Sequence, residues 1–313
     1  MPVIVLEAKD FTSPLSLVRT WALLSGCLTF SLVASLDPSE LAASLDHSEQ
    51  ALLSTFWILC MFTWCLFFIL TLLIHVLSVI QFHSLIPVSW KNLTVTVAAL
   101  AALMVLSASV IFPRMIVDHE VARPRPMVAT VASCLTFLAY ASEAFLIRTQ
   151  SQEQRGYMAS ASGLLKVLQF WGGCEMIPLF VEGARRALLA GDGKAIAWPW
   201  SWWQVWVSGV AYAICLVMSL GTVAVVLGDW AGRCPVPFDR LLAGFSLTGV
   251  LLYVVATILC FTRVLRLPTH CKKNIPSCPV QVVMETVVAS VTLLAYTVDL
   301  AFSVKLLRDR SHP

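Results

Sequence analysis

Charged side chains are scarce in this chain. Aspartate, glutamate, lysine and arginine make up 12% of its 313 residues, whereas hydrophobic residues make up 58%. A soluble domain of this size carries about twice that charged fraction. The shortage argues against a single water-surrounded core and indicates that most of the chain crosses a membrane. The net charge of +3 is too small, and the basic residues are too scattered, for a nucleic-acid partner.

The sequence also lacks the motifs of common enzyme and metal sites. It contains no phosphate-binding glycine loop, no nucleophile elbow and no helix with paired histidine ligands. Its 6 histidines are scattered, without the close spacing of zinc ligands. The polar connections are too short to hold a soluble catalytic domain. We therefore expect no catalytic residue, no metal site and no cofactor.

Eight apolar runs are long enough to cross a hydrocarbon layer of about 30 Å as helices. In lipid a helix satisfies its own backbone hydrogen bonds. The sequence therefore predicts an all-α, polytopic membrane protein with eight transmembrane helices. We expect the first run to be retained, because Glu7, Lys9 and Asp10 precede it rather than the basic stretch of a signal peptide. The predicted spans are 15–36, 51–80, 93–112, 127–147, 163–181, 204–227, 241–262 and 280–304.

Two short patterns occur twice at matching places. Leu138-Ala-Tyr-Ala-Ser-Glu143 returns as Leu294-Ala-Tyr-Thr-Val-Asp299, and Leu17-Val18-Arg19 returns as Leu164-Leu165-Lys166. Four spans lie in each copy, so the pattern indicates a parallel duplication. The predicted division is an N-terminal tail (1–14), a first four-helix unit (15–147), a linker (148–162), a second four-helix unit (163–304) and a C-terminal tail (305–313).

An even number of spans places both termini on one side. The first connection, 37–50, holds four acidic residues and no basic one, which suits the exterior, so we expect the tails and the linker to be cytoplasmic. Cys271 and Cys278 then lie in an exterior connection. In an oxidising compartment they either close a small disulfide or remain two thiols.

Each unit carries one basic and one acidic residue inside apolar segments. Arg19 lies about one turn into the first span and Glu143 about one turn before the end of the fourth, so they share a depth. Lys166 and Asp299 repeat this arrangement. A lone charge at the bilayer centre costs at least about 2.5–3.5 kcal/mol, and pairing lowers that cost. We predict Arg19–Glu143 and Lys166–Asp299 bridges.

Two other readings of these four charges stay open. Each side chain could reach the headgroups separately, because long charged side chains extend toward an interface. A proton or ion pathway is the least favoured reading, because the four charges lie near one face of the membrane rather than at the midplane.

Two further acids lie inside the predicted spans. Glu175 is about halfway along the fifth span, close to Pro178, and is the candidate buried acid. It is either a packing residue bonded to a neighbouring helix, which we favour, or a functional acid. Glu285 lies about one turn into the eighth span, at the end opposite to Asp299, where we expect water to reach it. Small-residue spacing, such as Gly244 with Gly249, favours close helix approach.

The order and spacing of several motifs resemble the myeloid-associated differentiation marker family over about residues 17–304. Both Leu-Ala-Tyr patterns belong to the resemblance. The other motifs are Phe30-Ser-Leu-Val-Ala-Ser35, Met61-Phe-Thr-Trp-Cys65, Ser89-Trp-Lys-Asn92, Gly156-Tyr-Met-Ala159, Ser162-Gly-Leu-Leu-Lys-Val-Leu168 and Pro237-Phe-Asp-Arg240. Glu175, Pro178 and the Arg- and Trp-rich connection 182–203 depart from the family's pattern.

The resemblance implies two tandem MARVEL domains, each a four-helix membrane unit. It implies a non-enzymatic role in organising ordered membrane domains, in membrane traffic or in cell-contact behaviour at the plasma membrane. The expected partners are membrane lipids, including cholesterol-rich domains, other membrane or cortical proteins, and a second copy of the chain. The alternative from another class is a transporter or channel at the interface between the halves, with Glu175 as coupling acid.

Overall fold

The described part of the chain is helical apart from short turns. The computed structural model describes residues 13–36, 47–80, 88–116, 124–149, 156–191, 202–228, 238–265 and 280–311. Within these ranges it contains eight α-helices, one short 3-10 helix and no β-strand. The all-α prediction is therefore confirmed.

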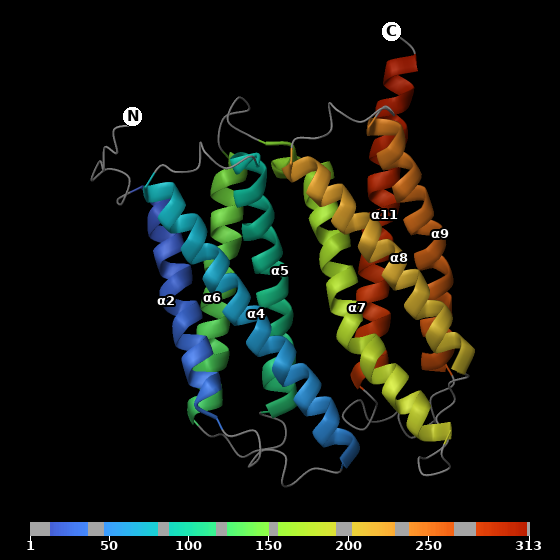
Figure 1. The fold of residues 1–313 in the computed structure, drawn as a ribbon, viewed down its shortest axis with the longest axis horizontal. Helices are drawn as coiled ribbons and strands as arrows, with labels where there is room; N and C mark the ends of the chain where they lie inside the picture. The colour runs from blue at the N-terminus through green and yellow to red at the C-terminus, as the bar shows by residue number, and fades with distance from the viewer. Residues whose placement is uncertain are drawn as a thin grey trace. The chain divides into compact units, whose positions relative to one another are not determined.

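Each of the eight α-helices contains a segment long and apolar enough to cross a membrane, so the prediction of eight transmembrane helices is confirmed. In chain order the elements are α2 (Pro14–Ala34), α4 (His47–Val79), α5 (Trp90–Ile116), α6 (Pro124–Thr149), η3 (Tyr157–Ala159), α7 (Ala161–Gly191), α8 (Trp202–Leu227), α9 (Phe238–Leu265) and α11 (Val280–Ser311), as shown in Figure 1.

The start of α2 follows from its local sequence. The hydroxyl of Ser13 accepts a hydrogen bond from the backbone N–H of Ser16 at 3.2 Å, so it caps the helix. Pro14 occupies the first turn, where its missing N–H costs nothing. This start places Arg19 in the second turn of the helix.

The predicted end of the fifth span was wrong. We expected a span over 163–181 and a connection over 182–203, but α7 continues to Gly191 with Pro178 inside it. The charges that ended the apolar run neutralise each other on the helix. Arg185 donates from Nε and Nη2 to the carboxylate of buried Glu182, at 2.9 and 2.6 Å. Because the two residues are one turn apart, their pairing is compatible with continued helix.

The chain divides into two compact units, Met1–Leu164 and Leu165–Pro313. Within unit 1, η3 packs on α5. There the backbone N–H of Met158 donates to Asn92 Oδ1 at 3.1 Å.

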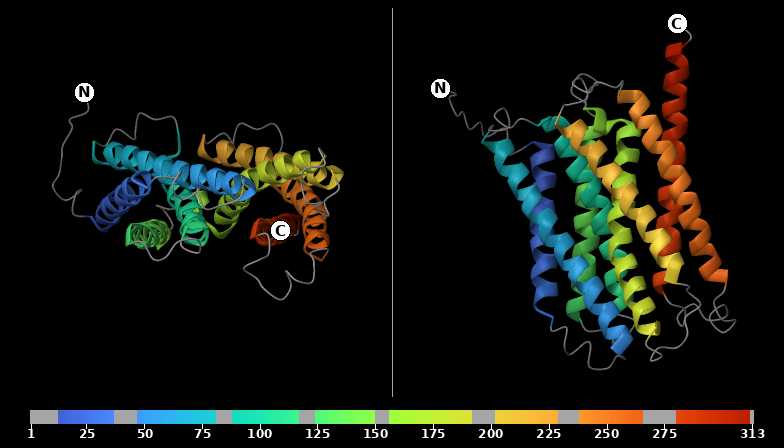
Figure 2. Two further views of the ribbon diagram at one scale, coloured as in Figure 1. Left: turned by 90° about the horizontal axis from the view of Figure 1, so that it is seen from below. Right: turned by 45° about the vertical axis from the view of Figure 1, so that its right-hand side comes forward.

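Each unit is a four-helix arrangement. In unit 1, α6 packs along α2 and α5, while α4 contacts α2 and α5. In unit 2, α11 packs along α9, and α9 contacts α8. The second helix of each unit, α4 or α8, crosses its neighbours obliquely (Figures 1 and 2).

Candidate functional site in the polar cores of the two units

The first and fourth helices of unit 1 share a buried ion pair. Arg19 of α2 donates from Nε to Glu143 Oε1 of α6 at 2.6 Å. The two side chains are 4% and 5% exposed, respectively. Their positions in the sequence predict a shared depth, and the structure brings the two side chains into contact. Each charge is therefore neutralised inside the unit rather than at its surface.

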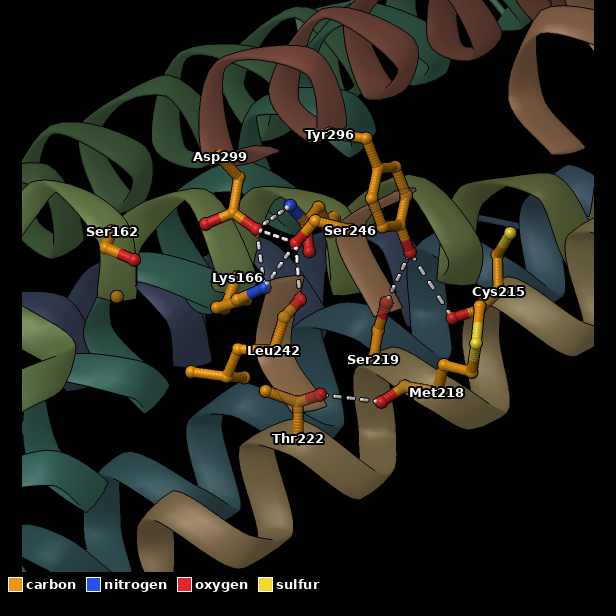
Figure 3. A network of polar contacts seen from close by, with 12 residues as sticks. Ser162, Lys166, Cys215, Met218, Ser219, Thr222, Leu242, Ser246, Tyr296 and Asp299 are labelled. Carbon is orange, nitrogen blue, oxygen red and sulfur yellow. Dashed lines mark hydrogen bonds and ion pairs between the residues drawn. The ribbon is translucent and has the colours of Figure 1, made fainter. Parts of the chain in front are cut away.

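Unit 2 repeats this pair with additional partners. Lys166 Nζ of α7 lies 2.5 Å from Asp299 Oδ2 of α11, and the side chains are 3% and 0% exposed. Gln169 Nε2 donates to the same carboxylate oxygen at 3.1 Å. Ser246 of α9 donates to Asp299 and accepts from Lys166 Nζ at 3.1 Å, so three helices meet at one carboxylate (Figure 3).

The sequence predicts the pairing of Lys166 with Asp299, but the contacts of Gln169 and Ser246 were not predicted. Gln169 had a usable signal, because a residue three positions after Lys166 lies on the same helix face. Ser246 had none, since serine is common in apolar helices and its bond to Asp299 joins different spans.

The tyrosines of the two Leu-Ala-Tyr patterns make matching contacts. In unit 1, Tyr140 OH lies 2.9 Å from Thr71 Oγ1 and donates to the Phe67 carbonyl at 3.1 Å. In unit 2, Tyr296 OH lies 2.8 Å from Ser219 Oγ and donates to the Cys215 carbonyl at 3.4 Å (Figure 3). In both units the hydroxyl and the carbonyl are four residues apart on the second helix. The repeated tyrosine therefore joins the fourth helix to the second.

The third helix is joined differently in each unit. In unit 1, Ser109 of α5 lies 2.8 Å from Ser133 of α6, which accepts from Trp64 Nε1 of α4 at 3.0 Å. In unit 2 the third helix, α9, is joined through Ser246, which bonds directly to the Lys166–Asp299 ion pair. Neutral hydrogen bonds therefore join the third helix to its neighbours in unit 1, whereas a charged cluster joins it in unit 2.

A second buried ion pair lies in unit 2, near the opposite end of α11 from Asp299. Arg263 Nη1 of α9 lies 3.0 and 3.1 Å from the two oxygens of Glu285, and the side chains are 2% and 6% exposed. Arg263 Nη2 also donates to Ser208 Oγ at 3.2 Å, and Tyr212 OH lies 3.4 Å from Glu285 Oε1. The expectation that water reaches Glu285 was wrong, because α8 and α9 cover its carboxylate.

The structure gives less information about the remaining candidate residues. Glu175 is buried on α7, three residues before Pro178. Cys271 and Cys278, the candidate disulfide, lie outside the described residues. Among the described residues, no group of three or more His, Cys, Asp or Glu side chains is placed to hold a metal ion.

Comparison with known proteins identifies the family. The chain is 32% identical over 318 residues to the myeloid-associated differentiation marker of Rattus norvegicus, an alignment that covers 96% of this chain and 92% of the relative. It is 30% identical over 326 residues to the homolog from Xenopus laevis, covering 97% and 96% of the two chains. The chain belongs to the myeloid-associated differentiation marker family.

The chain is also similar to a second group of proteins in this family. The chain is 30% identical over 309 residues to myeloid-associated differentiation marker-like protein 2 of Homo sapiens, covering 93% of this chain and 91% of that protein. No family model and no solved structure matches the chain. The names of these family members describe markers of differentiation and state no reaction.

Proposed function

We propose that this family member is a non-enzymatic organiser of ordered membrane domains. The observation that carries the proposal is the length of its spans. Seven of the eight candidate spans found in the described residues are 25–29 residues long. At a rise of 1.5 Å per residue, such helices extend about 38–44 Å. The average hydrocarbon layer is about 30 Å thick and that of the sterol-rich plasma membrane about 32–33 Å. Long spans therefore favour the thicker, sterol-rich bilayer.

The outward faces of the units support this function. Large apolar side chains project from the described helices, including Leu24, Phe145, Val217 and Leu251. Four charged pairs of the helices lie largely inside the units. A surface of this kind acts through lipid and helix contact rather than through a reactive group.

The proposed partners are the lipids of cholesterol-rich domains, other membrane or cortical proteins, and a second copy of the chain. The proposed location is the plasma membrane, with both termini cytoplasmic. The resemblance to MARVEL domains and the acidic first connection support this placement.

The test uses vesicles drawn from the plasma membranes of cells with and without the tagged protein. We expect enrichment in the ordered phase and a higher temperature at which the two phases mix. The second measurement separates an organiser from a passenger, because a passenger enters the ordered phase without changing its stability. Glu175→Gln should leave both results unchanged if Glu175 is a packing residue.

Exclusion of the wild-type protein from the ordered phase would contradict the proposal. So would an unchanged mixing temperature at high expression. The Glu143→Gln variant serves as a folding control, because it removes one partner of a buried pair in unit 1.

A further inference from the structure

A histidine lies inside the apolar span of α4. His75 comes one turn before Val79, the last residue of that helix. Its side chain is partly exposed, and no hydrogen bond joins its imidazole to another described residue. A polar side chain inside a span has a cost that an apolar one would avoid. The groups beside the imidazole therefore decide what it contributes.

His75 lies at the level of the Arg19–Glu143 ion pair. Thr71 of α4 contacts Tyr140 of α6 at 2.9 Å, and His75 and Glu143 each follow that contact by about one turn. Because α4 and α6 end on the same side of unit 1 (Figure 1), both turns lead in the same direction. Arg19 of α2 is near enough for its charge to act on the imidazole. Three helices thus place a histidine, an arginine and a glutamate at one level.

The other charged side chains on the described helices packed against α4 are exposed, so solvent and headgroups screen them. They are Lys91 and Arg114 of α5 and Arg125 and Arg148 of α6, all near helix ends. The described cysteines of α2, α4 and α6 lie more than two turns from the level of the ion pair. The hydroxyl of Tyr140 is neutral near pH 7, because tyrosine has an ordinary pKa of about 10. Arg19 and Glu143 are therefore the charges that surround His75.

Unit 2 has valine at the matching place. Thr71 and Ser219 make the same contact with the repeated tyrosines, so His75 corresponds to Val223, four residues after Ser219. Val223 is apolar and buried. The ion pair of unit 2 is completed instead by an uncharged amide and a hydroxyl. The matching place in unit 2 therefore cannot gain a charge, whereas the place beside the ion pair of unit 1 can.

Protonation of His75 changes the charge balance of this cluster. With a neutral imidazole, one cation and one anion cancel. A charged imidazole leaves two cations and one anion beside side chains that are 4% and 5% exposed, and an enclosed net charge is costly. The unfolded chain has no such cost, so it binds more protons than folded unit 1 below about pH 6.5, the ordinary pKa of histidine. The folded state therefore loses stability as the pH falls below that value.

We propose that His75 makes unit 1 a pH-sensitive element of this protein. Acidification on the side of the membrane where α4 ends adds a proton to the partly exposed imidazole. The new charge opposes Arg19 and loosens the contact that Arg19 and Glu143 make between α2 and α6. Unit 2 keeps its Lys166–Asp299 contact, because it has valine in place of the histidine. This regulation goes beyond membrane organisation and does not depend on it.

The test follows thermal unfolding of the purified full-length protein in an uncharged detergent, from about pH 7.5 to about pH 5.5. Over this range the unfolding temperature of the wild type should fall by about 3 °C more than that of His75→Val. The variant should fold, because it introduces the residue that unit 2 carries at the matching place. Equal falls in the two proteins would overturn the proposal.

Two further variants test whether the effect comes from the ion pair. His47→Val is the matched control, because His47 begins the same helix at its opposite end, and it should keep the pH dependence of the wild type. In Arg19→Gln the charged imidazole becomes the partner of Glu143. Compared with Arg19→Gln/His75→Val, this variant should therefore gain stability on acidification. Loss of the pH dependence in His47→Val, or an unreversed effect of His75 in Arg19→Gln, would overturn the proposal.

Hydrogen–deuterium exchange of the wild-type protein shows where acidification acts. After correction for the pH dependence of intrinsic exchange, backbone amides near Arg19 in α2 and Glu143 in α6 should exchange faster at about pH 5.5 than at about pH 7.5. Those near Lys166 and Asp299 of unit 2 should not change. Equal loosening of both units, or of neither, would overturn the proposal, because only unit 1 carries the histidine at this level.

Discussion

Glu143 is neutralised by Arg19 in a setting where both side chains are buried. Removing one member of a buried pair leaves the other charge without compensation, which costs about 3–5 kcal/mol. Replacing both members removes the two charges together and costs less. The ion pair is therefore best understood as two charges that must be present or absent together.

The first prediction concerns this coupling. Glu143→Gln should lower the free energy of unfolding by about 3–5 kcal/mol, and the double variant Arg19→Gln/Glu143→Gln should lower it by less than the single change. Equilibrium unfolding in detergent measures the difference, and the amount of protein at the cell surface should follow the same order. Equal losses in the single and double variants would show that the two residues do not interact.

The repeated tyrosines allow a second prediction at the same scale. Tyr140→Phe and Tyr296→Phe each remove a hydroxyl that contacts a side-chain oxygen and a backbone carbonyl on the second helix. Each change should cost about 1 kcal/mol, the net value of a typical hydrogen bond. Thermal unfolding of both variants measures the cost. A clear loss in one unit alone would mean that the matching contacts are not equivalent.

At the scale of the helix, close approach in unit 2 depends on particular glycines. A Cβ added to Gly249 of α9 would overlap Cδ1 and Cε1 of Tyr296, whereas a Cβ added to Gly244 would meet nothing within 4 Å. The sequence spacing treated these two glycines alike. Of these two glycines, only Gly249 lies against the Tyr296 ring of α11.

The third prediction uses this pair as variant and control. Gly249→Ala should lower the free energy of unfolding by about 1–3 kcal/mol, because the tyrosine ring must move. Gly244→Ala should raise it by about 0.5–1 kcal/mol, since alanine costs less backbone entropy than glycine in a helix. Unfolding curves for the two variants decide the question. Similar behaviour of the two would contradict the packing of Tyr296 on Gly249.

At the scale of the whole molecule, eight spans require both termini on one side of the membrane. The fourth prediction is that tags at the N- and C-termini react with antibodies only after cells are permeabilised. A tag inserted into the acidic connection 37–50 should react in intact cells. Opposite behaviour of the two terminal tags would contradict an even number of spans.

The two halves also differ as wholes. The described part of unit 1 shows one buried ion pair between helices, Arg19–Glu143, whereas that of unit 2 shows two, at Glu285 and Asp299 of α11. A duplication that began with like halves has therefore diverged in polarity along its core.

The sequence by itself determined the membrane class, the eight helices and the residues that form the Arg19–Glu143 and Lys166–Asp299 contacts. These features depend on hydropathy and on depth in the membrane, and both follow from a residue's position along the sequence. A charge placed one turn inside an apolar run has few partners at its depth. Its partner can therefore be inferred without knowing how the helices pack.

The tertiary structure alone decided the Arg263–Glu285 pair, the contacts of Ser246 and the role of Gly249. Arg263 lies just beyond the predicted span 241–262, because a charge ends an apolar window whether it is buried or exposed. Which side chains meet between spans depends on how each helix is rotated and on which helix lies beside it. Packing sets that rotation, so residues of equal hydropathy on one helix reach different surroundings.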